Sequence, residues 1–219
     1  MLQKLIIVDD FYDDPLEVRK RALQLEFPEH GGRATYAGRN SRLYLLNPQM
    51  LEMFSRLVGQ PLVPARNSPT GHFRISLASD AASQDIHTDP ARDWAGILYM
   101  NLPEQCRGGT TFFRHKALGI DEIPGDPEAI RRLGFKDRED MRLSLVERDG
   151  KDRGKWEATM TVPMRFNRLI LFRPWMWHSF TENFGDSMDS GRLIQVFFFE
   201  VAGTRPPAAT AAAGSRIGA

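Results

Sequence analysis

Polar caps and apolar stripes predict two helices in the first third of the chain. Asp14 with Pro15, and Asn47 with Pro48, each place a side-chain acceptor directly before a proline, which is typical of a helix start. Apolar residues then recur at helical spacing, at Val18, Ala22 and Leu25 in the first segment and at Met50, Leu51, Phe54, Leu57 and Val58 in the second. A short apolar run at 4–8 precedes both helices and predicts a strand.

From residue 73 onward the apolar residues alternate or run continuously, which is typical of strands. Strands are predicted at 73–77, 95–101, 110–113, 156–162, 168–172 and 192–201, with a further short one at 44–46. Gly108 and Gly109 favour a hairpin turn before one of them. Two helices followed by many short strands predict a mostly β protein with flanking helices, in which antiparallel sheets form a roll and the N-terminal helices buttress one sheet.

A charged segment at 114–155, with a predicted helix at 126–133, interrupts the strands. It has too few apolar residues for a core of its own, so we predict an insertion within a single domain that spans 1–202. Such a long insertion is typical of a lid or binding loop, and we expect it to cover a site and become ordered when substrate binds. Residues 29–40 predict a loop near the site entrance, and 203–219 predict a low-complexity tail.

Composition and charge exclude several classes of protein. With 219 residues, 42% of them hydrophobic, the chain can bury one sizeable core. Its formal charge is +1 and its basic residues are scattered, so no nucleic-acid partner is expected. The lone Cys106 excludes an internal disulfide and a thiolate zinc cluster. With no apolar run of about eighteen residues and no signal-peptide start, the sequence predicts a soluble cytoplasmic protein without a membrane partner.

Two histidines and an aspartate form a candidate metal site. His87 and Asp89 are separated by one residue, so on an extended segment both side chains project to the same face. His178, far along the chain, is the candidate third ligand. Two imidazoles and one carboxylate leave positions open on a metal ion, which suits non-haem Fe(II) oxygenases. The same donors also suit Zn²⁺ with an open water site.

Arg192 opens the last apolar strand and needs an anion if it is buried. It lies two residues from Ile194 and four from Val196, so a strand directs all three side chains to one face. Because an unpaired buried guanidinium costs free energy, a ligand carboxylate held bidentately is a suitable partner. Glu200 and Asp189 are the alternative partners within the chain.

Several segments taken together resemble a known family. They are Val8-Asp9-Asp10-Phe11, His87-Thr88-Asp89, Gly108-Gly109-Thr110-Thr111-Phe112, Leu169-Ile170-Leu171-Phe172 before His178, and Arg192. The pattern is similar to that of Fe(II)/2-oxoglutarate-dependent oxygenases of the prolyl-hydroxylase-like branch, and residues 11–19 resemble an uncharacterised bacterial subgroup. The resemblance spans nearly the whole chain apart from 114–155 and the tail. It implies a double-stranded β-helix, the jelly-roll or cupin-like fold.

The resemblance also implies a role for each main candidate residue. His87, Asp89 and His178 would hold Fe(II), and Arg192 would pair with the distal carboxylate of the cosubstrate 2-oxoglutarate. The spacing from His178 to Arg192 is longer than the branch usually shows, and residues 185–190 read as a lengthened hairpin that accounts for it.

Other residues are candidates for holding the cosubstrate or orienting a ligand. Leu77 stands where the family often has a cosubstrate-binding tyrosine, so Tyr99 or Arg74 is the candidate replacement, and either can equally be structural. Thr111 is a further candidate donor, although threonine is also a common strand former. Asp85 is a candidate partner for a ligand imidazole, with a surface turn as the alternative.

The resemblance implies an oxidative reaction that uses O2. We expect hydroxylation or desaturation of an unactivated C–H bond in an amino acid, a peptide residue or a small metabolite, and the sequence leaves substrate and oligomeric state undefined. Two other classes stay open. One is a zinc-dependent hydrolase or isomerase on the same roll, which gives Arg192 no specific task. The other is a non-catalytic cupin-like binding domain.

Overall fold

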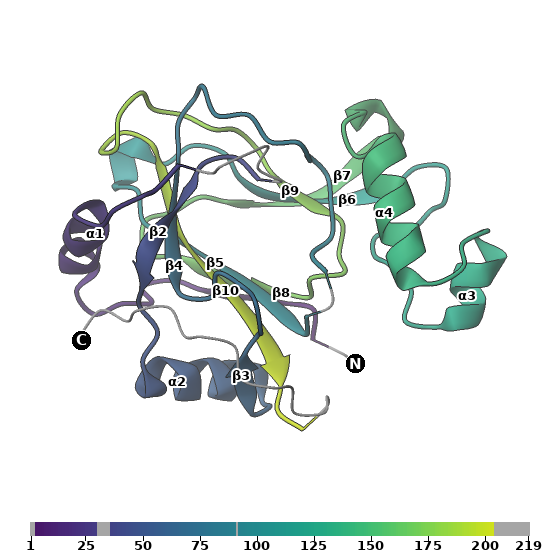
Figure 1. The fold of residues 1–219 in the computed structure, drawn as a ribbon, viewed down its shortest axis with the longest axis horizontal. Helices are drawn as coiled ribbons and strands as arrows, with labels where there is room; N and C mark the ends of the chain where they lie inside the picture. Colours follow the sequence, from purple (N-terminus) through teal and green to yellow (C-terminus); the bar gives the residue numbers. More distant parts are fainter. Residues whose placement is uncertain (1–2, 30–35, 91, 204–219) are drawn as a thin grey trace.

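Two antiparallel β-sheets facing each other form the body of the molecule, in a computed structural model that describes residues 3–29, 36–90 and 92–203 (Figure 1). The larger sheet has the order β1-β8-β5-β10-β4-β2, with β3 also paired to β10. Its strands are β1 (Leu5–Val8), β2 (Arg39–Tyr44), β3 (Leu62–Pro64), β4 (His72–Ser76), β5 (Trp94–Tyr99), β8 (Leu169–Phe172) and β10 (Arg192–Val201). The smaller sheet has the order β7-β6-β9 and contains β6 (Gly109–His115), β7 (Trp156–Pro163) and β9 (His178–Phe180). The predicted mostly β architecture is confirmed.

Helices α1 (Pro15–Leu23) and α2 (Pro48–Val58) cover the outer face of the larger sheet (Figure 1). The Asp14 carboxylate accepts a hydrogen bond from the Glu17 amide at 3.1 Å, and the Asn47 side chain accepts one from the Met50 amide at 2.8 Å. Both caps agree with the sequence prediction. The helices share a hydrophobic cluster with the sheet that includes Ala22, Met50, Phe54, Phe73, Ile75, Leu193, Phe197 and Phe199. The two helices therefore buttress one sheet, as predicted.

Strand β10 separates this cluster from the space between the sheets. Leu193 and Phe197 belong to the cluster that contains the helices, whereas Ile194 and Val196 belong to a second cluster between the sheets. Alternation along a strand explains the division, because successive side chains point to opposite faces. Arg192 has the same parity as Ile194, so it faces the space between the sheets.

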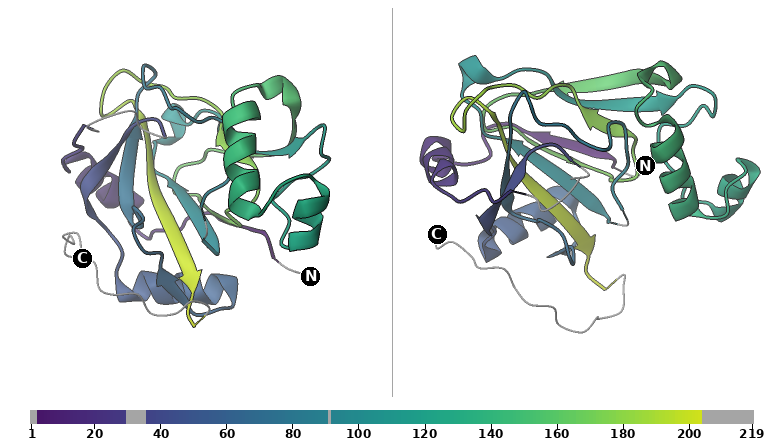
Figure 2. Two further views of the ribbon diagram at one scale, coloured as in Figure 1. Left: turned by 45° about the vertical axis from the view of Figure 1, so that its right-hand side comes forward. Right: turned by 45° about the horizontal axis from the view of Figure 1, so that its top comes forward.

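The segment between β6 and β7 contains two helices, α3 (Pro127–Arg132) and α4 (Arg138–Asp149), where the sequence predicted one. A 3-10 turn, η2 (Arg153–Lys155), leads into β7, and another, η1 (Pro103–Gln105), precedes β6. Helices α3 and α4 lie on the opposite side of the molecule from α1 in every view (Figures 1 and 2). Both start at aspartate caps, Asp126 and Asp137.

Helix α4 is anchored by a cluster that the insertion shares with the strands. The cluster contains Ile86, Phe113, Ile123, Ile130, Met141, Leu145, Val146, Trp156 and Trp177. The segment has few apolar residues of its own, as the sequence indicated. Residues outside it, among them Ile86 and Trp177, complete a core with it, and the sequence did not predict this core. Helix α4 contributes Met141, Leu145 and Val146 to this cluster and so packs on the roll. Ordering of the segment on substrate binding stays a prediction.

A buried ion network ties α4 to the smaller sheet as well. The Asp149 carboxylate is bound by His115 Nε2 at 3.0 Å, by Arg148 at 2.8 Å and by Lys155 at 2.5 Å. Burial raises the pKa of Asp149, but the hydrogen bonds from Arg148, Lys155 and His115 outweigh it and hold the pKa well below its usual range. The Asp149 carbonyl also accepts a bond from the Trp156 indole at 2.9 Å.

Two local predictions are corrected by the larger sheet. Strand β2 spans Arg39–Tyr44, whereas the sequence favoured a loop to residue 40 and a strand at 44–46. Most residues of β2 are polar, so the strand lacks the polar–apolar alternation from which a strand is predicted. Residues 30–35 of the predicted loop and nearly all of the predicted tail lie outside the described residues. Within the described ranges, none of the helices has the length and apolar character needed to cross a bilayer.

Candidate metal centre and adjoining pocket

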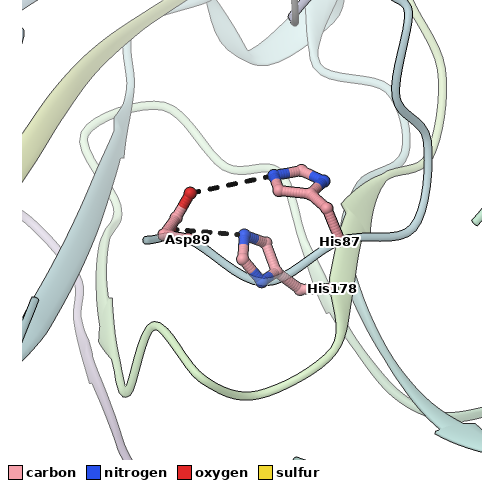
Figure 3. Close-up of side chains that lie close together, drawn as sticks. All are labelled: His87, Asp89 and His178. Carbon is pink, nitrogen blue, oxygen red and sulfur yellow. Dashed lines mark ion pairs between the residues drawn. The ribbon is translucent and has the colours of Figure 1, made fainter. Parts of the chain in front are cut away.

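The side chains of His87, Asp89 and His178 converge, and their nearest donor atoms all lie within 4.8 Å of one another (Figure 3). His87 Nε2 is 3.8 Å from one carboxylate oxygen of Asp89, and His178 Nε2 is 3.7 Å from the other. The structure thus brings together all three residues that the sequence singled out. Figure 3 shows both rings turned towards the carboxylate.

Backbone pairing explains why residues so distant in sequence meet. His87 and His178 exchange both backbone hydrogen bonds of an antiparallel bridge, at 3.0 and 2.9 Å. Directly opposed residues of such a pair project their side chains to the same face. The two ring centroids are accordingly 4.6 Å apart. The Asp89 amide donates to the Pro174 carbonyl at 2.9 Å, which extends the pairing and fixes the third side chain.

Each imidazole is oriented by a carbonyl two residues upstream. His87 Nδ1 lies 2.7 Å from the Asp85 carbonyl oxygen, and His178 Nδ1 lies 2.9 Å from the Met176 carbonyl oxygen. A carbonyl can only accept, so Nδ1 carries a proton in both rings, and Nε2 is the nitrogen that faces Asp89. Burial lowers the pKa of His178 to about 4, so this imidazole is neutral near pH 7. Both rings thus present the same nitrogen, Nε2, to a metal ion.

Asp85 supports the centre through its backbone and links it to the insertion through its carboxylate. Arg153 binds the carboxylate with two hydrogen bonds, at 2.7 and 3.0 Å, and the Ser179 hydroxyl donates to it at 2.5 Å. Burial raises the pKa of Asp85, but the bonds from Arg153 and Ser179 outweigh it and the net pKa is lowered. The sequence pointed to Asp85 as an imidazole partner, and the partner atom is its carbonyl rather than its carboxylate.

A pocket between the two sheets, called here the inner pocket, contains the three converging side chains. The smaller sheet and its extension supply His87, Asp89, Thr110 and His178, and the larger sheet supplies Arg74, Ser76, Ile97, Phe172, Arg192, Ile194 and Val196. Arg192, Ile194 and Val196 share one wall, as the strand parity predicted. The inner pocket therefore has a metal-binding constellation on one side and an arginine on the other.

Arg192 is 4% exposed, and its guanidinium makes no ion pair or hydrogen bond with the residues that the structure describes. Its nearest aromatic contact is the Phe180 ring, with the guanidinium carbon 5.6 Å from the centroid. Burial lowers the pKa of Arg192. The alternative partners do not reach it, because Asp189 pairs with Arg19 at 3.2 Å and Glu200 is eight residues further along the strand, roughly 26 Å away.

Arg74 is a second arginine in the inner pocket, and its contacts carry no negative charge. Its Nε donates to the Asn40 side-chain carbonyl at 2.8 Å, and its guanidinium lies 3.6 Å over the Tyr36 ring. Burial lowers the pKa of Arg74 to about 10, and this group remains protonated near pH 7. The sequence named Arg74 as a candidate for binding the cosubstrate, and the structure places it in the same cavity as Arg192.

Tyr99 and Thr111 lie apart from the pocket lining. The Tyr99 hydroxyl is fully buried and hydrogen-bonds with the Thr110 hydroxyl at 2.8 Å, and burial raises its pKa. The Thr111 hydroxyl contacts Thr161 on β7 at 2.9 Å, on the opposite face of β6. Thr110, not Thr111, lines the inner pocket. Because β6 is buried on both faces, its sequence did not reveal which threonine points inward.

Two solved structures are similar to this chain over most of its length. One is HygX from Streptomyces hygroscopicus, with nickel, 2-oxoglutarate and hygromycin B bound, at 11% identity and a TM-score of 0.50, covering 92% of this chain and 84% of that chain. The other is SnoN from nogalamycin biosynthesis, described as a non-heme alpha ketoglutarate dependent epimerase, at 16% identity and a TM-score of 0.50, covering 98% and 91%. Likeness at this identity shows the fold alone, and it agrees with the jelly-roll prediction.

Sequence comparisons give a family without a known function. Residues 2–199 match the family described as "Family of unknown function (DUF6445)". No curated protein matches the chain in sequence.

Proposed function

We propose a function for this chain, which belongs to the DUF6445 family of unknown function: it is an Fe(II)- and 2-oxoglutarate-dependent oxygenase that hydroxylates or desaturates an unactivated C–H bond. Its partner would be a small molecule or a peptide residue. The proposal rests on the inner pocket, where a candidate metal centre and an unpaired buried arginine lie together.

The donor set of the pocket fits Fe(II). Two imidazole nitrogens and one carboxylate, from His87, His178 and Asp89, are converging donors, and they leave coordination positions open for other ligands. Fe(II) held there would bind 2-oxoglutarate and O2, and it would couple the oxidative decarboxylation of 2-oxoglutarate to succinate and CO2 with the oxidation of a substrate C–H bond.

The single observation that carries the proposal is the unpaired Arg192. A buried guanidinium without an anion is costly, and a protein that retains one needs a ligand to complete it. A dicarboxylate with one end at the metal and the other at Arg192 supplies that anion in a bidentate form. A zinc-dependent hydrolase or isomerase gives this arginine no such role, and succinate formation separates an oxygenase from a domain that only binds the cosubstrate.

The other residues of the pocket position the cosubstrate and limit water. Ile194, Val196 and Phe172 form apolar walls beside the arginine, which strengthens a charged pair by excluding solvent. The Thr110 hydroxyl, held by Tyr99, is a further donor on the pocket surface. Tyr99 thus acts on the pocket through Thr110 in this proposal.

The test is binding followed by turnover. Calorimetric titration of 2-oxoglutarate into the Ni(II)-loaded protein without O2 is expected to show one site, and Arg192→Gln is expected to weaken it roughly 10- to 100-fold. The exposed Arg131→Gln on α3 removes the same charge as a control and is expected to bind normally. The Fe(II)-loaded protein is then expected to form succinate in air. Absence of 2-oxoglutarate binding to the wild-type metal-loaded protein would refute the proposal.

A further inference from the structure

A second pocket, called here the outer pocket, adjoins the inner pocket at the candidate metal centre. Its lining includes Arg74, His87, Asp89, Arg92 and Arg142. Arg74, His87 and Asp89 belong to both pockets, whereas Arg192 lines only the inner one. The candidate metal centre therefore borders both pockets through His87 and Asp89, and the outer pocket remains for a substrate when a cosubstrate occupies the inner one.

Positive charge dominates the lining of the outer pocket. Arg74, Arg92 and Arg142 are its three basic residues, and Asp89 is the single acidic residue among those described there. The Asp89 carboxylate is one of the three candidate metal donors, and a divalent ion would more than neutralise it. Counted over these lining residues, the pocket carries a net positive charge when a divalent ion is bound at the centre.

Arg142 reaches the outer pocket from α4, and only part of its guanidinium is used in hydrogen bonds to Glu139. Its Nε and one terminal nitrogen bind the Glu139 carboxylate at 2.8 and 2.6 Å. The other terminal nitrogen makes no hydrogen bond with the part of the chain that the structure describes. The side chain is only 13% exposed, and the neighbouring Met141 and Leu145 are fixed in the cluster with Ile86. The insertion therefore holds the Arg142 guanidinium at the outer pocket with one terminal nitrogen available to bind a ligand.

Arg74 lies at the junction of the two pockets and has no carboxylate partner within ion-pair distance in the described ranges. Asn40 and Tyr36 orient its plane without supplying negative charge. One carboxylate of a cosubstrate satisfies one guanidinium fork, so 2-oxoglutarate on Arg192 leaves Arg74 without an anion. A second anion is needed to complete the site.

We infer that the substrate of this oxygenase carries an anionic oxygen group, a carboxylate or a phosphate, which Arg74 and Arg142 bind in the outer pocket. This inference rests on the proposed function and deepens it. The two arginines come from β4 and α4, so binding joins the roll to the insertion. The insertion then supplies Arg142 as a specificity-determining residue, and α4 does not have to move for Arg142 to bind the substrate.

Three probes that share a phenyl ring and differ in their polar group test this inference, two of them anionic and one neutral. Benzoate, phenyl phosphate and neutral benzamide are titrated into the Ni(II)-loaded protein without O2, first alone and then with 2-oxoglutarate at saturation. Benzoate or phenyl phosphate is expected to bind in the presence of 2-oxoglutarate, and benzamide is not. The better of the two anions identifies the group. Benzamide that binds as tightly as the better of the two anions, or no binding of either anion at millimolar concentration, overturns the inference.

Three variants then assign the site. Arg142→Gln and Arg74→Gln are each expected to weaken the anionic probe roughly 10-fold or more. Arg142 does not line the inner pocket, so Arg142→Gln is also expected to leave the 2-oxoglutarate affinity at the wild-type value. Arg131→Gln is the control for charge loss on the same insertion and is expected to bind as the wild type does. Arg142→Gln keeps the test valid if Arg74→Gln does not fold.

The outcomes separate this inference from the proposed function. Loss of 2-oxoglutarate binding in Arg74→Gln but not in Arg192→Gln would reverse the roles of the two arginines and overturn the inference. Wild-type protein that binds the anions but never 2-oxoglutarate would refute the proposed function and leave the anion preference of the outer pocket standing.

Discussion

Arg192 and Arg19 form a natural pair for testing whether an arginine is retained for a ligand or for the fold. Each is 4% exposed. Arg19 donates to the Met100 carbonyl at 3.0 Å and to the carbonyl and carboxylate of Asp189 at 2.8 and 3.2 Å, whereas Arg192 has no such partner among the described residues. The same substitution, arginine to methionine, therefore removes a satisfied group at one position and an unsatisfied group at the other.

The expected effects on stability have opposite signs. Arg19→Met leaves two backbone carbonyls without their donors, and the 77%-exposed Asp189 carboxylate returns to water at little cost, so the free energy of unfolding should fall by about 2–3 kcal/mol. Arg192→Met removes an unpaired buried charge, so the free energy of unfolding of the ligand-free protein should rise or change by less than about 0.5 kcal/mol.

The expected effects of the two substitutions on cosubstrate binding also differ. Loss of a charge-assisted pair costs about 1.5–3 kcal/mol, so Arg192→Met should raise the dissociation constant of 2-oxoglutarate roughly 10- to 150-fold, and Arg19→Met should leave it unchanged. Arg192→Lys should fall between the wild type and Arg192→Met, because an ammonium keeps the charge but loses the fork. Urea denaturation and calorimetry measure the two quantities.

One combination of results would refute the reasoning. If Arg192→Met lowers the free energy of unfolding as much as Arg19→Met does, and its folded fraction binds 2-oxoglutarate with wild-type affinity, Arg192 is a structural residue.

Further predictions concern the metal centre and the insertion. Asp89→Ala should weaken Ni(II) binding by more than roughly 100-fold in a metal titration, since losing even an outer partner costs 10- to 100-fold; unchanged stoichiometric binding would contradict the centre. Amide exchange in α4 should be slow and the same with and without 2-oxoglutarate, because the helix is packed. Gly150→Ala should destabilise the protein by about 1–3 kcal/mol in urea, since a Cβ there would lie 2.5 Å from the Val146 carbonyl oxygen. Asp149→Asn should cost roughly 3 kcal/mol at pH 7, and because the pKa of Asp149 is depressed in the fold, the difference from the wild type should shrink as the pH falls below about 4.

Signals that are local in the sequence were sufficient for the helices that buttress the roll. Asp14 and Asn47 each cap a helix that begins at the next residue, a proline, because the acceptor, the fixed proline φ and the apolar stripe all lie within one or two turns. The shared parity of Arg192, Ile194 and Val196 was equally local, and all three residues line the inner pocket.

The features that the sequence did not reveal depend on distant partners. Helix α4 is rich in charge, and its few apolar residues become a core only against Ile86 and Trp177, which lie outside any window centred on the helix. The position of Arg142 at the outer pocket follows from that packing, so it was also hidden. The sequence could not show which of Thr110 and Thr111 faces the inner pocket, because their strand has no polar–apolar alternation. The register with β7, in which Thr111 pairs with Thr161, decides between the two orientations.

The same packing positions the histidines of the candidate metal centre. Ile86 and Trp177 precede His87 and His178 in sequence and point into the cluster with α4, so the two histidines are directed into the inner pocket by alternation. The backbone bridge and the two carbonyl partners fix the imidazoles further. Protein contacts alone therefore hold the two histidines in place, unlike small zinc domains, in which metal binding supplies the folding free energy. An ion bound by His87 and His178 would not be needed as a structural crosslink, and this suits an ion that keeps open positions for reactants.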